Sequence, residues 1–240
     1  MTLDDRAARP MRTPLMGSRY AGSTVGSVAL VFLAAFEALA VATVMPTVTA
    51  DLDGRAWFST AFSATLAASV VGMVAAGLWS DRRGAVRPLL TSVALFIVGL
   101  MLAGLAPNMA LLVAARFVQG LGAGGLTVAL YVLVGQVYDP VDRPRILGAF
   151  AAAWVVPGIV GPFLAGVVAD SVGWRWVFLG VVGVALAALM LLVPTLRKVT
   201  EPDRSEPAGS ARGVRRLLLA AAVALAVVGL NLTGGARGVT

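Results

Sequence analysis

Apolar residues in this chain come in long, nearly uninterrupted runs, with no helical stripe or strand alternation inside them. At 1.5 Å per residue, a helix of about 20 residues crosses the roughly 30 Å of hydrocarbon in a bilayer. The runs therefore predict transmembrane helices. We expect them at residues 25–48, 58–79, 88–105, 109–137, 146–169, 176–193 and 217–232.

Basic residues gather in alternate polar segments between these runs. With the N-terminus in the cytoplasm, the inner segments hold 15 of the 19 Lys and Arg residues, whereas the outer ones hold only Arg55, Arg175 and Arg237. Inner loops of membrane proteins carry such an excess. Four aromatic residues then fall at the outer interface, where such residues gather: Trp57, Phe58, Trp174 and Trp176. The sequence predicts a multi-pass protein of the cell membrane with a cytoplasmic N-terminus.

One polar stretch divides the chain. Residues 195–211 are rich in Pro, Ser, Gly and mixed charge and have no apolar face, which is typical of a linker. A single apolar run after such a linker looks like the start of a second bundle. We expect four parts: a cytoplasmic tail at 1–24, a six-helix transmembrane bundle at 25–193, a cytoplasmic linker at 194–216 and a seventh span within 217–240.

Composition narrows the chemistry. Of the 240 residues, 59% are hydrophobic and 13% charged, too few charges for the surface of a soluble domain. Without Cys or His, the chain has no disulfide, no Cys/His zinc site and no Ser–His or Cys nucleophile. We therefore expect neither an enzyme nor a bound metal or cofactor. The net charge of +7 reflects arginines between apolar runs, which favours membrane topology over nucleic-acid binding.

Two charges lie inside predicted spans. Glu37 is midway along the first run, where a carboxylate costs roughly 3 kcal/mol. Low dielectric favours its neutral acid and brings it within reach of proton exchange; the alternative is a structural carboxyl bonded to a neighbouring helix. Arg116, in the fourth run, stays charged and needs a partner unless it snorkels to the interface. Gln119 is three residues on, on the same helix face. We expect an intramembrane polar site.

Two segments combine glycine with charge or proline. The inner loop between the second and third runs contains Gly77, Asp81, Arg82, Gly84 and Arg87, at a spacing that an ordinary basic loop does not need. In the fifth run, proline kinks the helix and closely spaced glycines allow another helix to approach. These residues are Pro157, Gly158, Gly161, Pro162 and Gly166.

A third glycine pattern is misleading. Gly120, Gly122 and Gly125 match the dinucleotide-binding spacing G-x-G-x-x-G. That fingerprint needs a preceding strand and a βαβ unit, whereas these glycines lie inside an apolar helix. We expect them to pack helices.

Taken in order, these segments resemble the major facilitator superfamily, especially its drug:proton antiporters. The inner loop matches the superfamily's motif A, and residues 116–122 are similar to its motif B, which the family ties to proton transfer. The fifth run resembles antiporter motif C, with Ala165 in place of one glycine. Glu37 stands nine residues before Pro46, where drug exporters carry an acidic residue.

The resemblance implies a fold and a function. The fold is an all-α membrane protein: a six-helix N-terminal bundle of two inverted three-helix repeats, followed by a seventh span. The function is proton-coupled export of a small molecule, lipophilic or cationic, in which Glu37, Arg116 and Gln119 couple protons to substrate. The remaining partner would be a C-terminal half encoded elsewhere. Two alternatives stay open: an importer or metabolite exporter of the same fold, and a truncated membrane protein without transport.

Overall fold

The computed structural model describes residues 15–17, 20–199, 213, 215–224, 226 and 229. Within them, six helices are long and apolar enough to cross a membrane. They are α1 (Ala21–Asp51), α2 (Phe58–Arg83), α3 (Val86–Gly104), α4 (Met109–Val137), α5 (Arg143–Val172) and α6 (Arg175–Leu196), with a short 3-10 turn, η1 (Arg55–Trp57), before α2. The prediction of an all-helical membrane bundle is confirmed.

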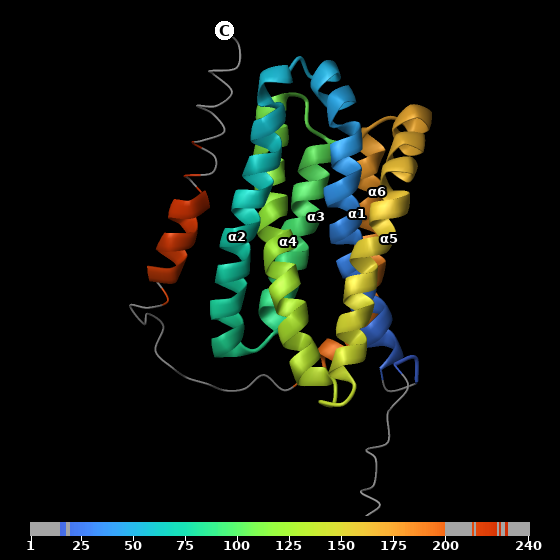
Figure 1. The fold of residues 1–240 in the computed structure, drawn as a ribbon, viewed down its shortest axis with the longest axis vertical. Helices are drawn as coiled ribbons and strands as arrows, with labels where there is room; N and C mark the ends of the chain where they lie inside the picture. The colour runs from blue at the N-terminus through green and yellow to red at the C-terminus, as the bar shows by residue number, and fades with distance from the viewer. Residues whose placement is uncertain are drawn as a thin grey trace, which may run out of the picture.

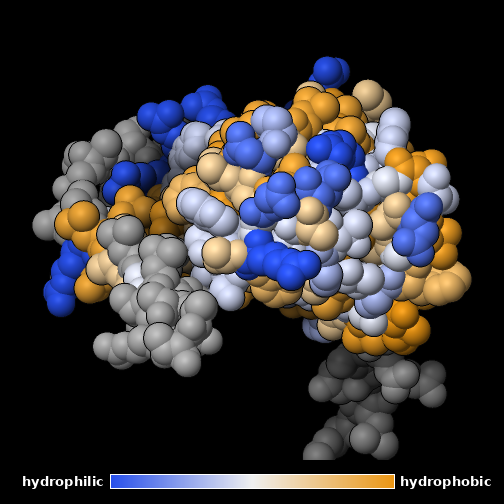
Figure 2. Space-filling view, turned by 90° about the horizontal axis from the view of Figure 1, so that it is seen from above, coloured by the Kyte–Doolittle hydropathy of each residue, from blue (hydrophilic) through white to orange (hydrophobic). Residues whose placement is uncertain are grey.

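The helices are longer than most of the apolar runs that predicted them. The run at 25–48 becomes the 31-residue α1, and α5 extends the run at 146–169 by three residues at each end. Helical hydrogen bonding continues beyond the hydrocarbon because polar residues at helix ends remain soluble in the headgroup region. Figure 1 shows the helices side by side along one axis, with connections at both ends. Seen end-on, hydrophilic residues gather over the end face and hydrophobic ones show at the flanks (Figure 2).

The packing relates the first three helices to the last three. Helix α1 packs against α5 and α6, whereas α4 packs against α2 and α3. The first helix of each group of three therefore packs against the second and third helices of the other group. The two groups meet mainly where α3 contacts α6. In Figure 1, α2, α3 and α4 lie to the left of α1, α5 and α6. This exchange is the arrangement expected of two inverted three-helix repeats.

Helix α4 lies very close to its neighbours because it is rich in glycine. A Cβ at Gly120 would overlap the backbone oxygen of Thr65 on α2, and one at Gly122 would overlap the backbone of Phe96 on α3. Gly124 meets Ser69 in the same way. Small residues allow this approach in membranes. The glycines that imitate a dinucleotide fingerprint therefore join three helices.

The predicted seventh span is only partly within the described residues. Residues 215–224 are helical, but the structure gives no membrane-length helix there, and most of 225–240 lies outside the described residues. The predicted tail at 1–24 and linker at 194–216 also lie largely outside them. These parts of the domain organisation stay predictions.

Candidate coupling site

The two charges predicted inside the membrane form one buried ion pair. Arg116 Nη1 on α4 donates to Glu37 Oε1 on α1 and, at 2.7 Å, to Oε1 of Gln119. Relative exposure is 3% for Glu37, 2% for Arg116 and 0% for Gln119. Arg116 therefore does not snorkel to the interface, and the expected polar patch exists.

The pair lies between two apolar layers. On α1 one cluster includes Leu30 and Val31, and the other includes Leu33 and resumes at Ala40. On α4 the fully buried members of the two clusters end at Ala115 and begin again at Leu126. Coulomb attraction is strong in such low-dielectric surroundings, and so is the cost of leaving either charge alone. The bundle therefore holds Glu37 and Arg116 at middle depth as one neutral unit.

The site also contains donors without acceptors. Arg116 Nε and Gln119 Nε2 are buried, and neither has a hydrogen-bond partner in the described part of the chain. Buried donors without partners cost free energy, so the site is not fully hydrogen-bonded within the described residues.

The inner loop between α2 and α3 turns at a glycine. Helix α2 ends at Arg83, and Gly84 follows with φ of 76°, a conformation that glycine adopts without strain. Asp81 is exposed, and no described side chain pairs with it. Arg82 is half-buried, and Arg87 is exposed at the start of α3. The loop presents acidic and basic groups at one end of the bundle.

The glycine and proline residues of α5 behave differently from the α4 glycines. A Cβ at Gly158 or Gly166 would meet nothing within 4 Å, and at Gly161 it would make ordinary contact with Phe36. Pro157 is buried and Pro162 is exposed. No described helix packs closely against Gly158 or Gly166, so this part of α5 is open to a partner.

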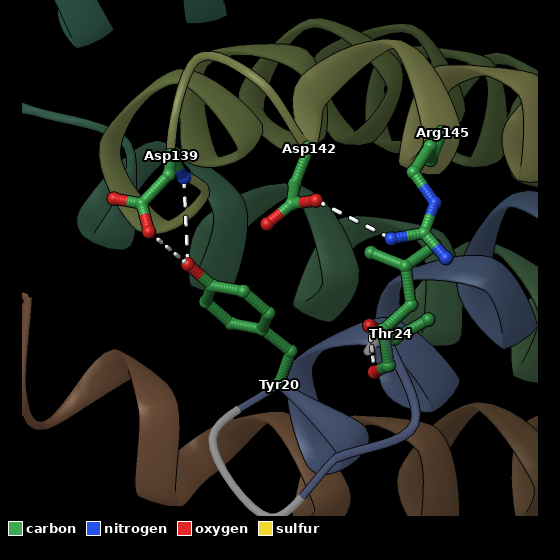
Figure 3. Close-up of polar contacts among 6 residues, drawn as sticks. Tyr20, Thr24, Asp139, Asp142 and Arg145 are labelled. Atoms are coloured by element: carbon green, nitrogen blue, oxygen red, sulfur yellow. Dashed lines mark hydrogen bonds and ion pairs between the residues drawn. The ribbon is translucent and has the colours of Figure 1, made fainter. Parts of the chain in front are cut away.

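Two polar clusters escaped sequence reasoning. At the bundle end shown in Figure 3, Tyr20 donates to Asp139 Oδ2 at 3.0 Å, and Asp142, fully buried, accepts from Arg145 at 3.3 Å. At the opposite end, Asp51 Oδ2 accepts from Trp174 Nε1 at 3.0 Å and from Arg175 at 3.2 Å. The only sequence signal was the position of these residues at span ends.

The Asp51 contact joins the end of α1 to the beginning of α6. Trp174 was predicted to line the outer interface, but it is only 4% exposed, because its indole packs in the bundle and donates to Asp51. Trp174→Phe keeps the ring packing but removes the hydrogen bond, and we expect it to lower stability by about 1 kcal/mol. Thermal unfolding in detergent, followed by circular dichroism, measures this. Asp51→Asn should lower stability less, since an amide oxygen still accepts from the indole; equal stability of Trp174→Phe and wild type would contradict the contact.

Comparison with known proteins identifies this architecture. The Major Facilitator Superfamily description matches residues 27–236. The chain belongs to the Major Facilitator Superfamily. Its fold is similar to that of a solved superfamily member, a proton:xylose symporter, with a TM-score of 0.63 and 16% identity, covering 92% of this chain and 54% of the symporter.

Several superfamily relatives resemble the chain in sequence. An uncharacterised MFS-type transporter of Mycobacterium tuberculosis is 34% identical over 72% of this chain and 25% of its own length. Multidrug resistance protein 3 of Bacillus subtilis is 30% identical, covering 67% and 31%. An MFS-type efflux pump from Fusarium is 27% identical, covering 88% and 38%. The chain thus spans a quarter to two fifths of the length of these transporters.

Proposed function

We propose that this chain forms the N-terminal part of a proton-coupled exporter of small lipophilic or cationic molecules in the cell membrane, with its N-terminus in the cytoplasm. The buried Glu37–Arg116–Gln119 unit carries the proposal. A titratable carboxylate at middle depth, fixed by a permanent cation, is a device for exchanging a proton. The relatives named as an efflux pump and a multidrug resistance protein support export.

Competition for one carboxylate gives the coupling. Glu37 binds either a proton or a cationic group of the substrate, and each occupant displaces the other. In both states Arg116 loses part of its attraction to Glu37 and keeps Gln119 Oε1 as its acceptor. When Glu37 has released both occupants and is charged, it pairs with Arg116 again and so links α1 to α4. Inward proton flow supplies about 2.3 kcal/mol per charge for each 100 mV of membrane potential.

The loop between α2 and α3 serves as the inner gate in this proposal. Asp81 has no described partner, and left-handed Gly84 holds it at the end of α2. We propose that Asp81, Arg82 and Arg87 bind the C-terminal bundle when the inner side closes. The open glycine stripe of α5, from Gly158 to Gly166, would pack against the same bundle.

The function is tested with the complete transporter in inverted membrane vesicles. Respiration acidifies the vesicle lumen, so an exporter should accumulate a fluorescent lipophilic cation there, and a protonophore should release it. Vesicles without the transporter are the control. Accumulation that persists without a proton gradient, or no accumulation for any of a panel of cations, would refute proton-coupled export of cations. Accumulation of a metabolite instead would favour a metabolite exporter of the same fold.

A further inference from the structure

A groove of about 370 Å³ separates α5 from α6, and α1 forms its floor. The two helices, on the right of Figure 1, both pack on α1 and touch each other little. Leu33, Ala165 and Val177 at the bottom of the groove are at most 5% exposed. Trp176 and Val184 at the rim are 55% and 52% exposed. The groove therefore runs from the surface of the bundle to its core.

The chemistry of the groove excludes water as its occupant. Every lining side chain is hydrocarbon apart from the indole of Trp176. A stable buried water needs two to four polar partners, and cavities lined by aliphatic and aromatic groups stay dry. The lining belongs to three helices of membrane-spanning length. At that depth, the molecules in contact with the bundle surface are hydrocarbon chains.

The size of the groove selects among hydrocarbon occupants. From Trp176 to Val184 it follows α6 for about 12 Å, at 1.5 Å per residue. Spread over that length, its volume corresponds to a mean cross-section of about 30 Å². A space of this cross-section admits a single extended hydrocarbon chain.

We propose that this groove binds one acyl chain of a bilayer phospholipid. Gly180 makes the room, because a Cβ at that position would meet nothing within 4 Å. The acyl chain would lie on Leu33, one helical turn before Glu37, and on Phe36, the residue directly before Glu37. The lipid thus packs against the segment of α1 that carries the buried carboxylate. This binding requires only the bundle and no transport activity, so the two proposals fail independently.

Two leucine substitutions on α6 make a matched test. Gly180→Leu places a side chain in the groove, while Gly183→Leu, where a Cβ also meets nothing within 4 Å, places one outside it. The 240-residue protein in detergent is titrated with phosphatidylcholine brominated on its acyl chains, which quenches tryptophan. The quenching that disappears in Trp176→Phe is the signal from the groove.

The expected signal saturates with lipid. Gly180→Leu should weaken lipid binding about tenfold, because a leucine replaces buried methylene contacts, and Gly183→Leu should leave it within about twofold. Circular dichroism checks folding, and Gly180→Val repeats the test with a smaller side chain. Quenching that never saturates, equal effects of the two leucines, or displacement of the lipid by an equimolar lipophilic cation would overturn the assignment.

Discussion

Glu37→Gln in the complete transporter is expected to abolish proton-driven accumulation of substrate while the protein still inserts and folds. The amide keeps the size of the side chain and an oxygen that accepts from Arg116, but it cannot exchange a proton at physiological pH. The measurement is uptake of a fluorescent lipophilic cation into inverted vesicles. Downhill movement of the same cation, without a proton gradient, should also fall, because the cationic group loses the carboxylate that binds it.

Two further variants distinguish loss of proton coupling from loss of stability. Asp53→Asn removes an exposed carboxylate outside the bundle and should transport normally; asparagine tolerates its φ of 48°. Arg116→Met removes the other partner of the buried pair and should cost about 3–5 kcal/mol of stability, because it leaves Glu37 without a counter-ion. Normal accumulation by Glu37→Gln would remove the carboxylate from the mechanism.

The second large effect is expected from the glycines of α4. Gly124→Ala should destabilise the bundle by about 1–3 kcal/mol, because its Cβ would overlap the backbone of Ser69 and push α2 away from α4. Gly135→Ala is the matched control on the same helix. Its Cβ meets nothing within 4 Å, so this change should be neutral or stabilising by up to about 1 kcal/mol.

Thermal unfolding of the purified variants in detergent distinguishes these outcomes. Gly124→Ala should melt at a lower temperature than wild type, and Gly135→Ala should not. Similar unfolding of the two variants would mean that α2 and α4 are not in the close contact that the structure shows.

The sequence predicted where the membrane-spanning helices lie, but not which side of each helix faces the core. Runs of apolar residues predicted every described span, since length and hydropathy decide whether a segment crosses a bilayer. They did not separate core from lipid-facing surface. Leu33 is 5% exposed and Leu66 is 65% exposed, although both are leucines within apolar runs. In a membrane, packing and lipid contact favour the same hydrophobic side chains.

The candidate site was predictable to the extent that its residues were unusual for their depth. Glu37 and Arg116 stood out as charges inside apolar runs, and Gln119 followed from helix periodicity. The contact of Asp51 with Trp174 joins residues 123 positions apart, at span ends where polar residues are ordinary. The groove at Gly180 depends on how α5 and α6 diverge over α1, which no local pattern encodes.

The exchange at Glu37 is tested most directly by counting protons when substrate binds. The complete transporter, in weakly buffered detergent solution with a pH indicator, is mixed with a lipophilic cation at a series of pH values. Competition for one carboxylate predicts proton release that rises toward one proton per bound cation at acidic pH in the wild type, and no release in Glu37→Gln. Proton uptake on binding, or the same release from both proteins, would contradict the account.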